Sequence, residues 1–316
     1  MAMSEAPHEE LVRTQDFVAD GPVELDLGIT VGRIDVLLSD TDSDTDSATG
    51  GDEAARTVSV ELREDPSSAS PWVHGLASTL SWITEQFGDQ FGAELSTSTA
   101  EAVSQTRIDM VGRRLVVHTP KQLPLRHIPL ALTVRAPAGS RLEVKTGSAR
   151  VTTTGTAGRA DVATSSGDVA FERATDAVSV RTGGGSVSLG PTPGGLHVRT
   201  GGGDVRAADV RGSATMVTGT GSVRIGSVTG DLVVRSGTGE LSVSDAASGS
   251  VNLRSGTGSV RIGVRSGVLA EVDLSSGAGT VSSELDVADT PPEGDVPLRI
   301  KASTGSGNAV ITAAEA

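Results

Sequence analysis

The chain has no cysteine, which excludes disulfide bonds and thiolate chemistry. Aromatic residues are also scarce, at 2% of the 316 residues. No apolar run approaches the roughly 18 residues that a membrane-spanning helix needs. The first ten residues have neither the basic region nor the apolar region of a secretory signal. We therefore expect a soluble, cytoplasmic protein without a transmembrane segment.

The net charge of −14 is unevenly distributed along the chain. Residues 1–100 contain 20 acidic and 4 basic residues, residues 101–270 contain 12 and 20, and residues 271–316 contain 8 and 2. A mildly basic centre therefore lies between two acidic ends. Solvated surface is the simplest interpretation of this distribution, although attraction between copies and folding back of an acidic segment are both compatible with it.

Glycine is abundant, with 40 residues, and much of it recurs at a fixed interval in the frame Val-x-Val-Arg-Thr-Gly-x-Gly-Ser-Val-x-Ile. The interval is 18 residues, which is too short for a repeated globular domain and is typical of one turn of a solenoid. Each turn leaves an apolar face that only the next turn can cover, so the turns must stack into one elongated body. The second glycine position of the frame falls at Ala149, Gly167, Gly185, Gly203, Gly221 and Gly239, and then at the looser spacing of Gly258, Gly279 and Gly307.

Alternation of apolar residues identifies the side chains that face inward, as with Leu196, Val198, Val205, Ala207 and Val210 in one turn. The sequence thus predicts an all-β fold, a single-stranded parallel β-solenoid or β-helix with coils of about 18 residues and one inserted α-helix. Three short strands per coil suggest a triangular cross-section, and a flatter coil of two sheets remains open, as does the hand of the coil. Eight to ten coils at about 4.8 Å each would form a rod of roughly 40–50 Å.

The pattern divides the chain into three parts. Residues 1–16 are expected to form a disordered acidic leader. Residues 17–141 are expected to contain degenerate coils, interrupted by an acidic loop at 39–53 and by the inserted helix at 70–96. Residues 142–316 are expected to form the regular coils.

The predicted helix begins after Ser70-Pro71, where apolar residues change to steps of three and four. It could cap or cover the solenoid, which is the more common use of such a helix, or it could dock a partner protein. The acidic residues on it argue against binding to an anionic membrane. The candidate interaction residues on its apolar stripe are Trp72, Leu76, Leu80, Ile83, Phe87 and Phe91.

The repeated Val-x-Val-Arg-Thr-Gly-x-Gly-x-Val-x-Ile coils, the opening Leu-Asp-Leu-Gly-Ile-Thr-Val-Gly-Arg-Ile from Leu25 and the segment Pro137 to Val144 resemble a bacterial β-strand-repeat family. Members of that family are labelled putative adhesins or a domain of unknown function. The resemblance covers most of residues 17–315 and implies a parallel β-solenoid. It brings no catalytic residues to this sequence.

Alignment of the coils stacks basic residues that point outward. One predicted ladder contains Lys145, Arg181, Arg199, Arg235 and Arg254, and a second contains Arg206, Arg224 and Arg261. Such ladders could bind a polyanion, or they could form a solubilising face, which is the simpler interpretation. Ala163, Val217 and Ser275 interrupt the ladders, and no aromatic residues lie between the basic ones to stack bases, which argues against nucleic acid.

Other functional motifs are weak. The loop from Asp40 alternates carboxylates as calcium sites do, but Ser47 replaces the glycine that an EF-hand needs, so we expect no calcium site. The glycine turns lack the spacing of calcium-binding β-rolls and of nucleotide-binding loops. The acids of the coils fall at different corners and His197 stands alone among them, so no catalytic constellation emerges.

We therefore expect a non-enzymatic β-solenoid that needs no cofactor or metal and acts as a scaffold or protein-interaction module. A protein partner or self-association is the expected mode of action, and the segment from Ala309 to Ala314 is expected to form the uncapped end of the rod. The alternative is a module that binds an anionic polymer through the arginine ladders.

Overall fold

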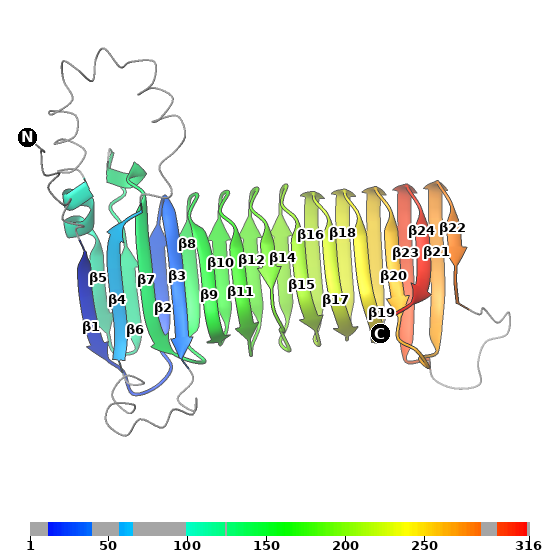
Figure 1. Cartoon of the computed structure of the whole chain (residues 1–316), viewed down its shortest axis with the longest axis horizontal. Helices are drawn as coiled ribbons and strands as arrows, with labels where there is room; N and C mark the ends of the chain where they lie inside the picture. Colours follow the sequence, from blue (N-terminus) through cyan, green and yellow to red (C-terminus); the bar gives the residue numbers. More distant parts are fainter. Residues whose placement is uncertain (1–11, 40–56, 66–98, 124, 286–295, 315–316) are drawn as a thin grey trace, which may run out of the picture.

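The computed structural model describes residues 12–39, 57–65, 99–123, 125–285 and 296–314. They form an all-β, solenoid-like rod in which 24 strands stack along the long axis of the molecule (Figure 1). The strands belong to two faces, here called sheet A and sheet B, and apolar side chains fill the space between them. The prediction of an all-β stack is confirmed, but the sheet is mixed rather than wholly parallel.

Sheet B contains, in spatial order, β5 (Arg107–Val111), β6 (Arg114–His118), β2 (Glu24–Ile29), β8 (Arg141–Thr146), β10 (Ala160–Thr164), β12 (Val178–Thr182), β14 (Leu196–Thr200), β16 (Ala214–Thr220), β18 (Leu232–Thr238), the second half of β19 (Leu241–Thr257), β23 (Leu298–Ser306) and β21 (Ala270–Ala278). Only the pair β5–β6 in this sheet is antiparallel.

Sheet A contains, in spatial order, β1 (Arg13–Val18), β4 (Thr57–Glu64), β7 (Leu130–Pro137), β3 (Gly32–Ser39), β9 (Arg150–Ala157), β11 (Val169–Ala174), β13 (Val187–Leu189), β15 (Val205–Val210), β17 (Val223–Thr229), the first half of β19, β20 (Val260–Val264), β24 (Ala309–Ala313) and β22 (Val281–Ser283). A 3-10 turn, η2 (Leu125–His127), and an α-helix at residues 99–105 complete the described elements.

In the middle of the rod, each strand pairs in parallel with the strand 18 residues later. Val178, for example, pairs with Leu196, and Leu196 pairs with Ala214. The side chains that alternation places inward are buried there, including Val198 and Val205. Because the inward side chains of successive coils stack on one another, the core is a continuous column made mainly of Val, Leu, Ile and Ala.

The Thr-Gly-x-Gly part of the frame forms the turn between the two sheets. The backbone N–H of Gly203 donates to the hydroxyl of Thr200 at 3.1 Å, and Thr200 is buried. Two coils further along, the hydroxyl of Ser236 donates to the carbonyl of Gly221 at 3.1 Å. A Cβ atom on Gly203 would lie 2.0 Å from the carbonyl oxygen of Gly185, so only glycine allows the turns to stack this closely.

The N-terminal end departs from the prediction at its first strand. Residues 13–18 form β1, which pairs antiparallel with β4, so the expectation of a disordered leader over residues 1–16 is wrong for residues 13–16. Phe17 of β1 packs against the core, which supplies the burial that a disordered segment lacks. The acidic loop at 39–53, apart from Ser39 at the end of β3, and the predicted helix at 70–96 lie outside the described residues.

The C-terminal coils stack out of sequence order. Strands β23 and β24 pair with β19 and β20, whereas the earlier strands β21 and β22 pair with the outer side of β23 and β24. Figure 1 shows β21 and β22 at the far end of the rod. The segment Ala309–Ala313 is therefore an inner strand, and the prediction that it forms the end of the rod is wrong.

Candidate interaction surfaces

The basic ladder predicted on sheet B is assembled by the parallel register. Arg181 of β12 lies beside Arg199 of β14, and Arg235 of β18 lies beside Arg254 of β19. Val217 separates the two pairs, as the sequence predicts. We call these four residues, Arg181, Arg199, Arg235 and Arg254, the arginine row. All four side chains are exposed, because they alternate with the inward residues of their strands.

The guanidinium groups of the arginine row form no ion pair with a carboxylate among the described residues. Within the described part of the chain, the row makes one side-chain hydrogen bond, from Arg254 Nε to the hydroxyl of Ser303 at 3.3 Å. Lys145, which the sequence places in the same ladder, differs because its ammonium group contacts Glu143 at 2.6 Å. The hydrogen bond and the charge of Glu143 raise the pKa of Lys145.

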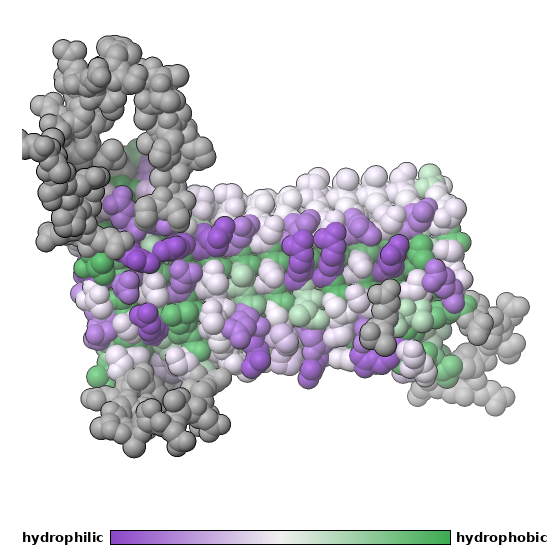
Figure 2. All heavy atoms as spheres, viewed as in Figure 1, coloured by the Kyte–Doolittle hydropathy of each residue, from purple (hydrophilic) through white to green (hydrophobic). Residues whose placement is uncertain are grey.

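The second predicted ladder, on sheet A, is compensated by an acid. Arg206 and Arg224 pair in register, and their guanidinium groups lie 3.7 Å and 3.9 Å from the same carboxylate oxygen of Asp204. Ser242 separates them from Arg261. The arginine row on sheet B therefore lacks the acidic partner that Arg206 and Arg224 share on sheet A. Figure 2 shows hydrophilic side chains gathered in rows along the rod on the face in view.

Several acidic side chains of the coils hold the stack together. Asp168 and Asp204 each accept a hydrogen bond at 2.9 Å from a backbone N–H of the next coil, and Asp231 does so at 3.1 Å. Asp209 accepts from the hydroxyl of Ser227 at 2.7 Å. These carboxylates therefore bridge adjacent coils and do not converge on a groove. Among the described residues, no group of three His, Cys, Asp or Glu side chains could hold a metal ion.

A charge cluster that the sequence did not reveal lies on sheet B near the N-terminal end. The carboxylate of Asp26 accepts from Arg114 Nη2 at 2.7 Å and lies 3.0 Å from His118 Nε2. Burial acts to raise the pKa of Asp26, but the hydrogen bonds from Arg114 and His118 outweigh it and lower the pKa. His118 is 92 residues from Asp26 in sequence, so only the pairing of β2 with β6 brings them together.

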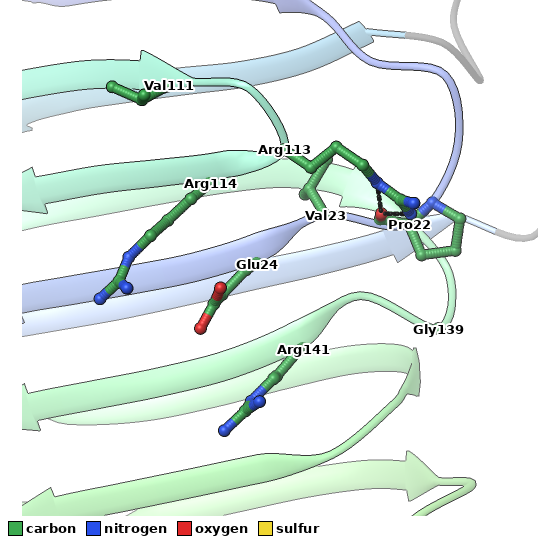
Figure 3. Close-up of a pocket in the computed structure, with 8 residues that line it drawn as sticks. All are labelled: Pro22, Val23, Glu24, Val111, Arg113, Arg114, Gly139 and Arg141. Carbon is green, nitrogen blue, oxygen red and sulfur yellow. Dashed lines mark hydrogen bonds between the residues drawn. The ribbon is translucent and has the colours of Figure 1, made fainter.

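A shallow pocket adjoins this cluster at the corner of the rod. In Figure 3 the side chain of Glu24 lies between those of Arg114 and Arg141. Arg113 donates through Nε to the carbonyl of Pro22 at 3.1 Å. Two of the three guanidinium groups are thus already occupied by groups of the chain itself. The pocket is lined by Pro22, Val23, Glu24, Val111, Arg113, Arg114, Gly139 and Arg141.

The helix at residues 99–105 closes the N-terminal end of the rod. Its Ala102 and Val103 are buried in the core, at 0% and 2% exposure. Arg13 Nη1 donates to the carbonyls of Val103 and Ser104 at 3.1 Å and of Thr106 at 2.7 Å. The sequence did not predict helix at these residues. The predicted interaction residues Trp72, Leu76, Leu80, Ile83, Phe87 and Phe91 lie outside the described residues.

The C-terminal end, in contrast, exposes core-facing side chains. Val272 of β21 and Val281 of β22 are 39% and 49% exposed. Their partners one coil inward, Ile300 and Ala309, are 2% and 0% exposed. Leu269, in the turn before β21, is 58% exposed. An apolar surface therefore lies at the end of the stack.

The sequence model of the Toastrack DUF4097 family matches residues 131–315, which is more than half of the chain. This match confirms the resemblance to a β-strand-repeat family of unknown function. No curated protein matches the chain. No helix among the described residues is long and apolar enough to cross a membrane.

Three solved structures are similar to most of the chain. A putative adhesin from Bacteroides fragilis has 13% identity, covers 95% of this chain and 97% of its own, and gives a TM-score of 0.43. A putative adhesin from Parabacteroides distasonis has 7% identity, covers 96% and 98%, and gives 0.32. A putative cell adhesion protein from Clostridium sporogenes has 7% identity, covers 96% and 99%, and gives 0.21.

Proposed function

The chain belongs to the Toastrack DUF4097 family, and we propose that it is a non-enzymatic interaction module whose arginine row binds an extended anionic polymer. The observation that carries this proposal is the absence of acidic partners around the row in the described structure. Most other arginines of the rod lie within 4.0 Å of a carboxylate, as Arg159 and Arg211 do. A row of exposed, uncompensated cations retains its attraction for an external anion.

The spacing of the row suits an extended ligand. Adjacent parallel strands lie about 4.8 Å apart, so Arg181 and Arg254, four strands apart, are separated by about 19 Å. A small anion could contact one neighbouring pair, whereas a polymer with regularly spaced charges could contact both pairs. Each exposed contact is weak, and affinity would come from their number and from the release of counterions. The row lacks interleaved aromatic side chains, so we propose a polymer other than nucleic acid.

The acidic residues of the coils favour a non-enzymatic role. Hydrolases and lyases that act on polysaccharides need carboxylates that converge on the substrate. Here Asp168, Asp204 and Asp231 are engaged by backbone N–H groups of adjacent coils. These hydrogen bonds support a structural role for the three carboxylates.

The proposal is tested by replacing two arginines in the row. Arg199→Gln with Arg235→Gln removes one cation from each pair and leaves the inward core unchanged. We expect affinity for immobilised heparin to fall about tenfold or more, and the slope of log K against log salt to decrease by about 2, one unit for each lost contact. Elution from a heparin column and isothermal titration at several salt concentrations would measure both.

The matched control is Arg206→Gln with Arg224→Gln on sheet A. It removes the same charge from the rod, but from cations that Asp204 already compensates. Retention on heparin should change little in this variant. Equal losses in the two variants would show that net charge alone governs binding and would contradict a role for the arginine row. Tighter retention on single-stranded DNA than on heparin would contradict the ligand class.

Protein interaction is a second candidate function, and the exposed C-terminal end favours it. Apolar side chains that belong to a core are uncovered there, beside the unpaired edges of β21 and β22. Surfaces of this kind mark sites of protein association. This function does not depend on the arginine row, which lies on the side of the rod.

A further inference from the structure

The C-terminal end of the rod offers both a backbone edge and an apolar floor. Strand β21 is the last strand of sheet B and pairs only with β23, whereas β22 is the last strand of sheet A and pairs only with β24, within the described residues. The outer sides of both strands therefore present N–H and C=O groups without a strand partner. Between them, Val272 and Val281 face the core direction and remain accessible to solvent. Another coil stacked on this end would pair with these backbone groups and cover the two valines.

Charge does not protect this edge. Natural edge strands often carry charges that repel a second strand. Glu271 and Asp273 occupy the outward positions of β21, but Arg299 and Lys301 on the next coil contact them at 3.4 Å and 3.0 Å. The pairs neutralise the edge locally, so an incoming strand meets little net charge.

The opposite end of the rod is a poor match for this surface. The helix at residues 99–105 covers the core there with Ala102 and Val103, and Arg13 holds the helix in place. The core-facing Ile108 of β5 is only 6% exposed. Addition of C-terminal end to N-terminal end would therefore join an open core to a closed one. This arrangement argues against the growth of a filament from repeated head-to-tail contacts.

We infer that two copies of this chain join head to head through their C-terminal ends in a closed, two-fold symmetric dimer. A two-fold axis normal to the sheets reverses the strand direction, so β21 meets its own copy in antiparallel orientation and β22 does the same. Both sheets continue from one rod into the next, and the two uncovered ends of the core become one. The contact is isologous and leaves no further open end, so association stops at two chains.

The oligomeric state tests the dimer. Sedimentation velocity of the full chain from about 1 to several hundred micromolar should show a shift from 31.9 kDa toward twice that mass, because a small interface gives micromolar affinity. The variant Val272→Lys with Val281→Lys places cations on both sides of the two-fold axis and should remain monomeric. The control Val18→Lys with Val111→Lys makes the same changes at exposed sites of the N-terminal strands and should dimerise as wild type does.

A cross-linking experiment tests the symmetry. Because the chain has no cysteine, Ser282→Cys introduces a single thiol at the centre of β22, the position nearest to the axis when this three-residue strand pairs with its copy. Under air oxidation it should form a disulfide-linked dimer on the order of a hundredfold faster than Ser188→Cys, which lies in the same outward row at the middle of the rod.

Three results would overturn the inference. One is a single mass of 31.9 kDa at the highest concentration. Another is a continuous series of larger species, which would indicate open head-to-tail growth. The third is equal cross-linking of the two cysteine variants. None of these results depends on polyanion binding, so loss of the dimer and loss of heparin binding can be distinguished.

Discussion

At the N-terminal end of the rod the core-facing apolar side chains are buried or partly buried, whereas at the C-terminal end Val272 and Val281 are 39% and 49% exposed. A helix, two antiparallel edge pairs and the hydrogen bonds of Arg13 close the first end. A parallel coil like those of the middle forms the second, and its Val272 is 39% exposed. Since stacking alone can never cover the last coil, a solenoid needs a different element to terminate it. Only the N-terminal end has such an element in the described structure.

The largest difference between the two ends is expected when the same substitution is made at both. Val103→Asp places a carboxylate in the closed end, where the side chain is 2% exposed, and should destabilise the rod by about 3–5 kcal/mol. Val272→Asp at the open end should cost less than about 1 kcal/mol in dilute solution, because water still reaches the carboxylate. Urea unfolding followed by circular dichroism would measure both. Similar losses at the two ends would mean that the C-terminal coil is covered in solution.

Removal of one basic residue at each end should give a smaller difference in stability. Arg13→Ala deprives three carbonyls at the N-terminal cap of their donor and should cost about 2 kcal/mol. Arg299→Ala removes an ion pair whose two side chains are each 70% exposed, and its unfolding curve should match that of wild type. The interpretation of Arg13 as part of the cap would be wrong if both variants unfolded like wild type.

The smallest expected difference between the ends is in how the free energy of unfolding changes at low pH. The pKa of Asp26 in the folded chain lies below its ordinary value of 3.8, because Arg114 and His118 stabilise the carboxylate against the effect of burial. The resulting stability is therefore present above that ordinary value and is lost as the pH falls through the lowered pKa. The free energy of unfolding of wild type should therefore fall at low pH, a decline here called the acid limb. Asp26→Asn should make the acid limb less steep in unfolding experiments across about pH 2–6.

The matched control for the acid limb is Asp273→Asn at the open end. Its carboxylate pairs with Lys301, but the side chain is 63% exposed. The free energy of unfolding of this variant should therefore fall at low pH as steeply as that of wild type. An acid limb that is unchanged in Asp26→Asn and less steep in Asp273→Asn would contradict the assignment of the acid limb to Asp26.

Periodicity predicted the middle of the rod well. Inward side chains such as Leu196 and Val205 follow from alternation, and the register of the arginine row follows from the 18-residue repeat. These features depend on neighbours one repeat away, which a single sequence displays directly. The hydroxyl of Thr200 is part of the same frame, but the frame alone does not reveal that it binds the backbone N–H of the turn.

The ends were predicted poorly for a physical reason. Val251 can pair equally well with any coil that offers an apolar residue in the same register, so the sequence does not distinguish Val272 from Ile300 as its neighbour. The structure chooses Ile300, 49 residues away, although 18 is the usual spacing. Likewise, the contact of Asp26 with His118 depends on the pairing of β2 with β6. Long-range choices of this kind leave no local signal.

The displaced order of the last coils has a consequence for biosynthesis. Residues 270–285 leave the ribosome before residues 298–313, but among the described strands β21 and β22 pair only with β23 and β24, which belong to the later segment. The earlier segment therefore has no docking site until translation of the later one is complete, since domains assemble from the N-terminus as the chain emerges. From β8 to β20 the strands stack in sequence order, and the order then reverses for one coil. Docking of β21 and β22 is thus tied to synthesis of residues 298–313.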